Sequence, residues 1–481
     1  MAESRSVRRW RQGLPKAVIL TVASALVGTV VLSWLLAGIV LHIWPWGVPP
    51  EPKDPVTVLD VIKVALTVVA GIGGAVALVV SYRKQHLAEA DAKANEILRF
   101  VERFGAAATQ LGDQAPAVRL AGVYAMASLA DEYATQRQQC IDVLCGYLRL
   151  PYSSDPDDQL LSGRVSETVH ASVDRTVREQ RTYSTQPNDR EVRATVVSVI
   201  RAHLIETAPV SWSDKNFDFT GAVLHNPHLS QATFAGEVTR FDWAQFTGET
   251  TSFSGVKFAG ETTSFYKAQF TSDKTSFDQA QFTSKTTRFG GAQFTGKATR
   301  FDWAQFTSKE TSFVGAQFTG RTTTFRDAQF TSARTSFDKA AFTGEQTSFY
   351  RAQFTSVETR FGGAQFTSVE TRFGGAQFTS VETRFDGAHF AGTATSFVGA
   401  QFTGAATSFG GAEFTGEEVR FEGATWDRVQ VTFDNVTIGP DTQFNGLDGP
   451  TLTNGATITA NEQPFTGPTS PPPSATPSGG G

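Results

Sequence analysis

Hydrophobic and polar positions follow three different rhythms along the chain. Two long apolar runs occupy residues 17–43 and 64–80, and amphipathic segments follow from residue 83 to residue 206. From Phe219 to Phe433, single large apolar residues instead recur every five or seven positions between polar ones. These rhythms predict membrane-spanning helices, a helical segment and a long series of short strands, in that order.

The two apolar runs predict a membrane hairpin. The first run, "AVILTVASALVGTVVLSWLLAGIVLHI", is longer than the roughly 20 residues that a helix needs to cross the hydrocarbon core. The second run is shorter, but residues from Val56 onward extend it, and its small residues allow close helix packing. We expect transmembrane helices at residues 17–43 and 56–81 and an external turn at 44–55. A buried core helix is the alternative for the second run.

Basic residues set the orientation that we expect for this hairpin. Five of them lie in the N-terminal segment 1–16, and Arg83 and Lys84 follow the second run, whereas the turn carries Lys53. The positive-inside rule then places both termini in the cytoplasm. The expected location is therefore the plasma membrane, with two spans and everything from Arg83 onward in the cytosol.

Residues 83–206 predict a small all-α segment. Helix-forming residues with spaced apolar positions recur in it, Pro116 and Pro151 separate the helices, and a polar loop is expected at about 153–165. The two cysteines of the chain lie here, five positions apart. Two cysteines are too few for a disulfide framework, so we expect reduced thiols without a redox or metal role.

The strand region opens with "FDFTGAVLHNPHLSQATFAG", in which Phe219, Leu224, Leu229 and Phe234 fall five residues apart. The residue two positions before each of them is usually small, as Ala222 is. Residues i−2 and i lie on the same face of an extended segment, so both point the same way. This region therefore predicts a coiled chain that turns one small and one large residue inward every five positions.

Beyond Phe234 the large residues alternate between spacings of seven and five. Each twelve-residue unit then divides into two groups of five, such as "TSFVG" and "AQFTG", and two extra residues, which we expect to bulge at a corner. The side chains that we expect in the core include Phe219, Leu224, Leu229, Phe234, Phe241, Phe246, Phe253, Phe258, Phe313, Phe318, Phe361, Phe366, Phe421, Trp426 and Phe433.

Three phrases before the repeats carry a family resemblance. "FGAAATQLGDQAPAVRLAGVYAMASLADE", "QQCIDVLCGYLRLPY" and "REVRATVVSVIRAHL" resemble the cytosolic helical segment of membrane-anchored pentapeptide-repeat proteins of the actinobacterial type. The resemblance implies a hairpin anchor, a helical adaptor and a pentapeptide solenoid. It implies no catalytic residue.

The fold that the resemblance implies is a right-handed quadrilateral β-helix, in which four groups of five residues complete a turn. The twelve-residue unit leaves two geometries open: a four-sided coil of 24 residues or a narrow two-sided coil of 12. The four uninterrupted groups at the start favour the four-sided coil, and phenylalanine needs its wider core. We expect the solenoid at residues 217–445, an irregular C-terminal cap at 446–466 and a disordered tail at 467–481.

Charge and candidate chemistry do not indicate an enzyme. The formal net charge is −5 in 481 residues, with acidic and basic residues nearly balanced. His225 and His228 lie three apart but have no carboxylate or cysteine at ligand spacing, so we expect no metal. Glycine pairs such as those of "FGGAQF" follow the repeat and are corner residues. No catalytic constellation, cofactor or small-molecule substrate is predicted.

Three functions remain, and the scaffold ranks first: a membrane-tethered solenoid that presents its repeat surface to a cytosolic protein. The second is mimicry of duplex DNA, by which some pentapeptide-repeat proteins bind DNA gyrase. It requires a strongly acidic face, which the balanced charges do not predict, and we expect no nucleic-acid partner. Ice binding through threonine columns such as Thr251, Thr263 and Thr275 ranks last, because these residues are the expected inward partners of phenylalanine.

Overall fold

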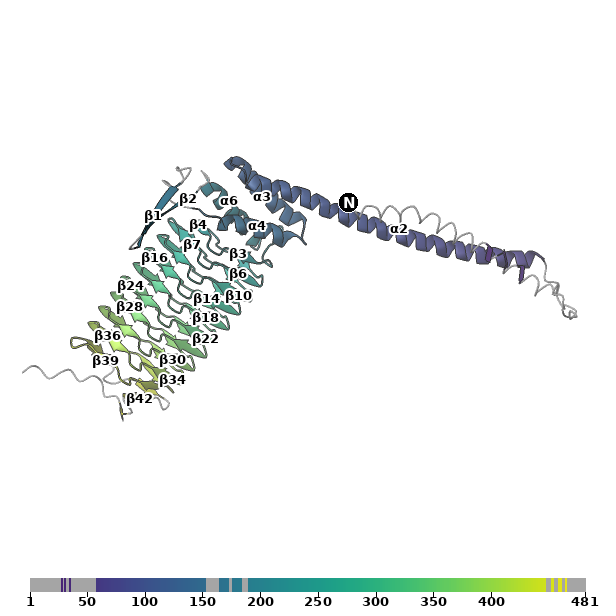
Figure 1. Cartoon of the computed structure of the whole chain (residues 1–481). Coiled ribbons are helices and arrows are strands. Elements are labelled where there is room, and N and C mark those ends of the chain that lie inside the picture. Colours follow the sequence, from purple (N-terminus) through teal and green to yellow (C-terminus); the bar gives the residue numbers. More distant parts are fainter. Residues whose placement is uncertain are drawn as a thin grey trace, which may run out of the picture. The chain divides into compact units, whose positions relative to one another are not determined.

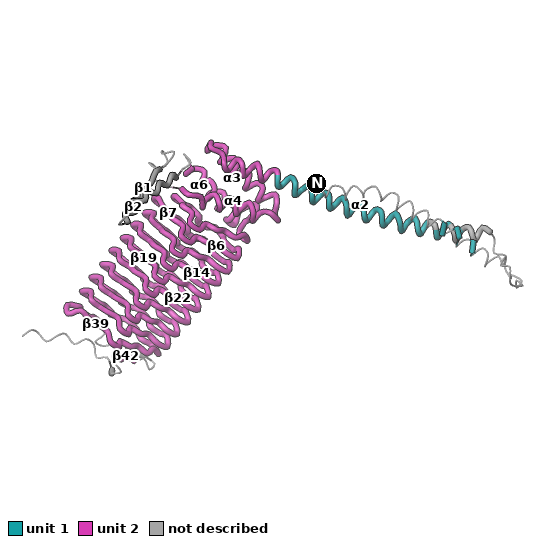
Figure 2. Tube along the Cα trace, in the orientation of Figure 1, with its two compact units in different colours: residues 1–101 teal, residues 102–481 magenta. Residues whose placement is uncertain are grey.

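The computed structural model divides into two compact units, residues 1–101 and 102–481 (Figure 2). The residues that the structure describes are 27–28, 30–31, 34–35, 58–152, 164–172, 175–183, 189–446, 451–453, 457–460 and 463–464.

The first unit is helical wherever the structure describes it. Its main element is α2 (Val58–Leu111), whose last residues from Glu102 belong to the second unit. From Leu66 onward α2 is long and apolar enough to cross a membrane by length and composition, and it is the one such helix among the described residues. Apolar side chains stand exposed along it, with Leu66 63% and Leu78 73% accessible.

Most of the predicted hairpin lies outside the described residues. This holds for the basic segment 1–16, for the turn 44–55 and for the first span 17–43, of which six positions between Val27 and Leu35 are described and are helical. The predicted second span, 56–81, overlaps α2 from Val58 onward.

Three helices in the second unit confirm a small all-α region before the solenoid: α3 (Pro116–Glu132), α4 (Arg137–Arg149) and α6 (Asp189–Leu204). Proline starts α3, where its missing N–H costs no hydrogen bond. The apolar faces of the helices meet in one core, whose fully buried side chains are Val123, Met126, Ile141, Leu144, Leu148, Val192, Val196 and Ile200.

Both cysteines lie on the buried face of α4 and are free thiols. Burial raises the pKa of Cys140 to about 11 and the pKa of Cys145 to about 12. A buried thiol of high pKa forms almost no thiolate at neutral pH, so both residues act as small apolar packing groups.

Two strands interrupt the helical region where none was expected. β1 (Arg164–Ser172) pairs antiparallel with β2 (Arg175–Tyr183), and Arg164 lies opposite Tyr183. The β-branched residues of this stretch, Val165, Val169 and Val177 among them, favour an extended chain. Residues 83–206 were expected to be helical apart from a polar loop at about 153–165, and the two strands correct that expectation.

Four sheets form the sides of the solenoid, and we name them face 1 to face 4 in the order in which the chain passes through them (Figure 1). Face 1 consists of β3 (Phe217–Asp218), β6 (Val238–Arg240), β10 (Thr262–Ser264), β14 (Thr286–Arg288), β18 (Glu310–Ser312), β22 (Arg334–Ser336), β26 (Glu358–Arg360), β30 (Glu382–Arg384), β34 (Ala406–Ser408), β38 (Gln430–Thr432), β42 (Thr457–Ala460) and β43 (Gln463–Pro464). Face 2 consists of β4 (Val223–His225), β7 (Gln245–Thr247), β11 (Gln269–Phe270), β15 (Gln293–Phe294), β19 (Gln317–Phe318), β23 (Ala341–Phe342), β27 (Gln365–Phe366), β31 (His389–Phe390), β35 (Glu413–Phe414) and β39 (Thr437–Ile438).

The chain enters face 3 after face 2, and face 4 completes each coil before the chain returns to face 1. Face 3 consists of β8 (Thr250–Ser252), β12 (Lys274–Ser276), β16 (Ala298–Arg300), β20 (Thr322–Thr324), β24 (Gln346–Ser348), β28 (Glu370–Arg372), β32 (Ala394–Ser396), β36 (Glu418–Arg420) and β40 (Gln443–Asn445). Face 4 consists of β5 (Thr233–Phe234), β9 (Lys257–Phe258), β13 (Gln281–Phe282), β17 (Gln305–Phe306), β21 (Gln329–Phe330), β25 (Gln353–Phe354), β29 (Gln377–Phe378), β33 (Gln401–Phe402), β37 (Thr425–Asp427) and β41 (Thr451–Thr453).

Strand pairing decides the size of the coil. Phe270 pairs with Phe294, and Thr275 with Thr299, so equivalent residues lie 24 positions apart in parallel strands. The four-sided coil of two twelve-residue units is therefore confirmed, and the narrow coil of 12 residues is excluded. At the first coil Leu224 pairs with Phe246, two positions short of 24, because the opening groups of five lack the extra pair of residues.

Four columns of aromatic rings fill the interior. Phe246 stacks on Phe270 with centroids 4.4 Å apart, and Phe265, which follows a face 1 strand, meets Phe277, which follows the face 3 strand of the same coil, edge to face at 5.6 Å. Offset stacks and edge-to-face contacts are the arrangements that aromatic rings prefer. None of the fifteen side chains expected in the core is more than 4% exposed: Phe219, Leu224, Leu229, Phe234, Phe241, Phe246, Phe253, Phe258, Phe313, Phe318, Phe361, Phe366, Phe421, Trp426 and Phe433.

Other elements cover the first coil of the solenoid and one face of its last coil. At the first coil α4 packs on β3, Gln138 Nε2 donates to the carbonyl of Asn216 (2.8 Å), and Arg149 Nη1 lies 2.6 Å from Asp218 Oδ2. At the other end the stretch 446–466, expected to be irregular, instead contains β41, β42 and β43. Strand β43 pairs antiparallel with β42, so it covers the last edge of face 1.

Candidate interaction surface

The outer surface of the solenoid carries the candidate functional residues, because phenylalanine columns fill its interior. Faces 2 and 4 repeat the triplet Gln-Phe-Thr, in which phenylalanine points inward and its two neighbours point outward. On face 4 this gives one column of glutamine and one of threonine: Gln281, Gln305, Gln329, Gln353, Gln377 and Gln401 beside Thr283, Thr307, Thr331, Thr355, Thr379 and Thr403. Both faces are therefore largely uncharged.

The threonine columns considered in the sequence analysis lie inside. Thr251, Thr263 and Thr275 are at most 2% exposed. The outward column of face 4, which begins at Thr283, was missed, although the alternation of "QFT" carries the signal.

Most charged residues of the solenoid lie on faces 1 and 3. In strands with the sequence Glu-x-Arg, the glutamate and the arginine of the same strand pair and cancel each other's charge. Arg360 Nε lies 2.5 Å from Glu358 Oε1, and Arg384 Nη2 lies 2.6 Å from Glu382 Oε2. Burial alone would raise the pKa of Glu358, but hydrogen bonds from Arg360 and Arg334 hold it below its ordinary value. Exposed pairs of this kind each contribute about 0–1 kcal/mol, so their main effect is to cancel charge.

Aspartates at the corners tie one coil to the next. Asp242 Oδ1 accepts a hydrogen bond from the backbone N–H of Tyr266 (3.0 Å), and Asp338 Oδ1 accepts one from Gly362 (2.8 Å). These carboxylates satisfy backbone groups that the strands leave open, so they are structural.

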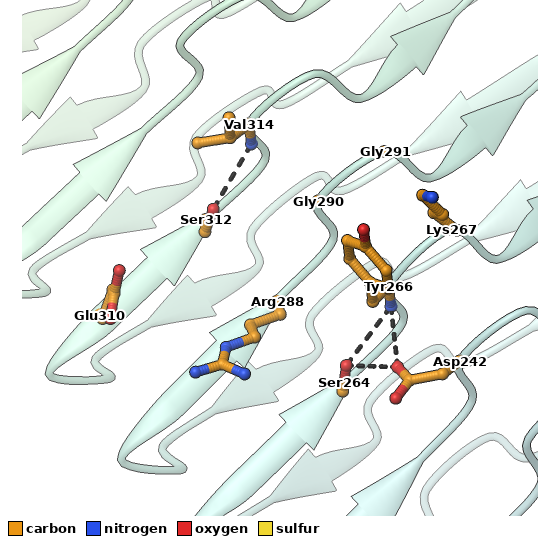
Figure 3. Close-up of a pocket in the computed structure, with 10 residues that line it drawn as sticks. All are labelled: Asp242, Ser264, Tyr266, Lys267, Arg288, Gly290, Gly291, Glu310, Ser312 and Val314. Carbon is orange, nitrogen blue, oxygen red and sulfur yellow. Dashed lines mark hydrogen bonds between the residues drawn. The ribbon is translucent and has the colours of Figure 1, made fainter.

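A groove runs along the corner between faces 1 and 2, which we call the Tyr266 groove (Figure 3). Its volume is about 640 Å³. Strands β10, β14 and β18 supply its floor, and the corner residues after them supply its wall. The lining residues are Asp242, Ser264, Tyr266, Lys267, Arg288, Gly290, Gly291, Glu310, Ser312 and Val314.

Exposed aromatic residues mark this corner and the corner between faces 3 and 4. Trp243 is 52% and Tyr266 43% exposed, and Lys267 Nζ lies 4.5 Å from the centre of the Trp243 ring. On the other corner Trp303 is 52% and Tyr350 45% exposed. Large exposed aromatic side chains are typical of protein interfaces, where they contribute much of the binding energy.

His225 and His228, which were considered as metal ligands, and His203, which precedes the solenoid, lie in different surroundings. His203 Nε2 lies 3.2 Å from Asp131 Oδ2, and its ring stacks on Trp212 at 3.9 Å between centroids. His225 Nδ1 lies 3.2 Å from Thr247 Oγ1, and His228 is exposed. In the part of the chain that the structure describes, no group of three His, Cys, Asp or Glu side chains is placed to hold a metal ion.

The parallel coils and their repeated corners define a β-solenoid repeat protein. Residues 219–269 match the family model described as pentapeptide repeats (9 copies). The chain therefore contains pentapeptide repeats, with two extra residues in every twelve-residue unit from Phe234 onward, so that part of the matched stretch carries them as well. No curated protein and no solved structure matches it. The right-handed winding stays a prediction from the family.

Proposed function

We propose that this protein is a non-enzymatic scaffold, anchored in the plasma membrane, whose solenoid binds a cytosolic protein. The observation that carries the proposal is the exposure of aromatic residues at two corners of a rod that buries its phenylalanines. A repeat surface of rigid columns suits recognition, because little conformational entropy is lost when it binds.

The membrane anchor rests on the apolar, exposed surface of α2 and on the basic residues that flank the two apolar runs. We propose two spans, 17–43 and 56–81, with both termini in the cytoplasm. Single cysteines introduced at Gly47 or Lys53 of the turn test this topology. They should react with a membrane-impermeant maleimide in intact cells, whereas a cysteine at Ser4 should not.

Affinity purification tests the scaffold. The intact chain should retain a partner that is lost when Trp243, Tyr266, Trp303 and Tyr350 are all replaced by alanine. Identical partner lists for the intact chain and for a chain without residues 217–464 would contradict the proposal, because the solenoid would then bind nothing.

Mimicry of duplex DNA ranks lower, because arginine neutralises glutamates on face 1, as in β26 and β30, and on face 3, as in β28. A DNA mimic needs a continuous acidic face. Ice binding ranks last, since the proposed orientation places the solenoid in the cytosol.

A further inference from the structure

Seven of the ten residues that line the Tyr266 groove recur 84 positions later in the chain, and the charged residues Asp242, Lys267 and Glu310 do not. Tyr266, Gly290 and Val314 follow one another up the corner between faces 1 and 2. Tyr350, Gly374 and Val398 do the same between faces 3 and 4. The strand residues two positions before them match as well, since Ser264, Arg288 and Ser312 correspond to Ser348, Arg372 and Ser396.

The two copies share their local geometry. A Cβ atom on Gly290 would lie 3.5 Å from Tyr266 Cδ2 and 3.6 Å from the carbonyl oxygen of Val314. A Cβ atom on Gly374 would lie 3.5 Å from Tyr350 Cδ2 and 3.5 Å from the carbonyl oxygen of Val398. In both copies the glycine therefore gives the tyrosine ring room to lie along the corner.

The copies differ in the charge of that arginine's surroundings. Arg372 Nη2 lies 2.7 Å from Glu370 Oε2 on its own strand, which neutralises it. The position equivalent to Glu370 in the first copy is Thr286, an uncharged residue. Arg288 is exposed, and within the described residues it has no ion pair. The same groove thus presents an open guanidinium in one copy and a neutralised one in the other.

The remaining charges of the Tyr266 groove define how a ligand must lie. Asp242 already accepts hydrogen bonds from Ser264 Oγ and from the N–H of Tyr266. Lys267 stands at the wall beside Tyr266, and Glu310 stands on the next strand beyond Arg288 (Figure 3). A negative group is therefore favoured between Tyr266 and Arg288 and disfavoured next to Glu310.

We propose that the Tyr266 groove binds a carboxylate side chain in an extended acidic segment of the partner protein, with Arg288 as its cation. The inference deepens the proposed scaffold function and rests on it. The guanidinium takes the carboxylate in a two-pronged contact, and the methylene groups of the acidic side chain pack on the Tyr266 ring. The Tyr350 copy does not bind such a ligand, because Arg372 already pairs with Glu370.

A direct binding measurement tests this. The full chain in lipid nanodiscs is titrated at low salt into two fluorescein-labelled peptides, Glu-Ser-Glu-Ser-Glu-Ser and Gln-Ser-Gln-Ser-Gln-Ser, and fluorescence anisotropy is followed. The glutamate peptide should bind at one site per chain and the glutamine peptide should not. Arg288→Gln should weaken binding about threefold to fivefold, the size expected for one exposed charge contact.

The two copies supply matched variants. Thr286→Glu copies the closed site and should weaken binding as much as Arg288→Gln does. Glu370→Thr removes the carboxylate that pairs with Arg372 and should raise the stoichiometry from one peptide to two. Circular dichroism of each variant controls for folding, since all three substitutions are on the surface.

Equal binding of both peptides would overturn the proposal, as would unchanged affinity in Arg288→Gln and Thr286→Glu. If the alanine variant of the four aromatic residues still loses its partner in that case, the scaffold proposal stands and this inference alone fails. If neither measurement depends on the solenoid surface, both proposals fail.

Discussion

The hydroxyl oxygen of Thr263 lies 2.7 Å from the hydroxyl oxygen of Ser284 in the next coil, inside the solenoid. The same contact recurs up the rod, as between Thr311 and Ser332 (2.8 Å). The hydroxyl of Ser332 also donates to the carbonyl of Phe306 (3.2 Å). A hydroxyl has one proton to donate, so the threonine must donate to the serine. The buried hydroxyl groups of these pairs are thus satisfied across coils without any charge.

Removal of one serine should show how much this hydrogen bond contributes to the free energy of unfolding. Ser332→Ala leaves the hydroxyl of Thr311 buried without this partner, which costs about 1–3 kcal/mol of unfolding free energy. The double variant Thr311→Val with Ser332→Ala should lose less than the single variant, because no polar group is then stranded. Urea denaturation measures both. A larger loss in the double variant would show that the hydroxyls do not act as a pair.

Inward phenylalanines should dominate stability. Phe318 is fully buried between Phe294 and Phe342, at 4.7 and 4.8 Å between ring centroids. Truncation of such a ring costs about 3–5 kcal/mol, and a carboxylate in its place costs more, so Phe318→Asp should unfold the neighbouring coils. Gln317→Asp, on the exposed side of the same strand, should change the unfolding free energy by less than about 0.5 kcal/mol. Equal thermal shifts for the two variants would contradict inward columns.

One corner position in each half coil requires a left-handed backbone. Gly387 has φ +63°, and no atom lies within 4 Å of a Cβ built there. Gly387→Ala should therefore cost about 1 kcal/mol through backbone strain alone. Gly387→Asn should cost less, because asparagine tolerates this conformation, as Asn435 does at φ +55°. The difference in unfolding free energy between the two variants is the measurement, and a more stable alanine variant would exclude strain as the cause.

The buried thiols predict a pH dependence of the helical region. Burial holds the pKa of Cys145 at about 12, above the value of 9.0 for a free thiol, so the folded state keeps a proton that the unfolded state loses. The stability from this group is complete below pH 9 and falls as the pH rises from there toward the folded pKa, by at most about 1.4 kcal/mol per pH unit. Cys145→Ala should show a shallower loss of unfolding free energy between pH 8.5 and pH 10.5. Parallel slopes would mean that the thiol does not titrate on unfolding.

Much of the solenoid follows from the sequence, since inward positions follow from alternation in short strands. The spacing from Phe219 to Phe234 already indicated four sides, and pairs such as Phe270 and Phe294 bear out 24 residues per coil. The corner serines were not anticipated. Each group of five was expected to point two residues into the core. Ser284 is a further buried residue, and it lies at the corner where the two extra residues of the twelve-residue unit are inserted.

Other parts depended on contacts that no local pattern reveals. The strands β1 and β2 stabilise each other by pairing, and polar residues dominate both, so neither alone shows a buried face. The strands β41 and β42 form on edges that earlier coils provide. The Tyr266 groove is visible in the sequence only after the coil length is known, because Tyr266, Gly290 and Val314 become neighbours at a period of 24 and at no shorter one.

Each coil contains two twelve-residue units, so inserting or deleting one unit rotates all later residues by half a turn about the axis of the rod. Tyr350 follows Tyr266 by seven units, an odd number, so the two tyrosines stand on opposite corners. Loss or gain of one unit between them would turn everything beyond it by half a revolution and bring the two corners into line, while the phenylalanine columns would still match. Duplication of a single unit therefore changes the side of the rod to which all later residues point. Duplication of two units changes only the length of the rod.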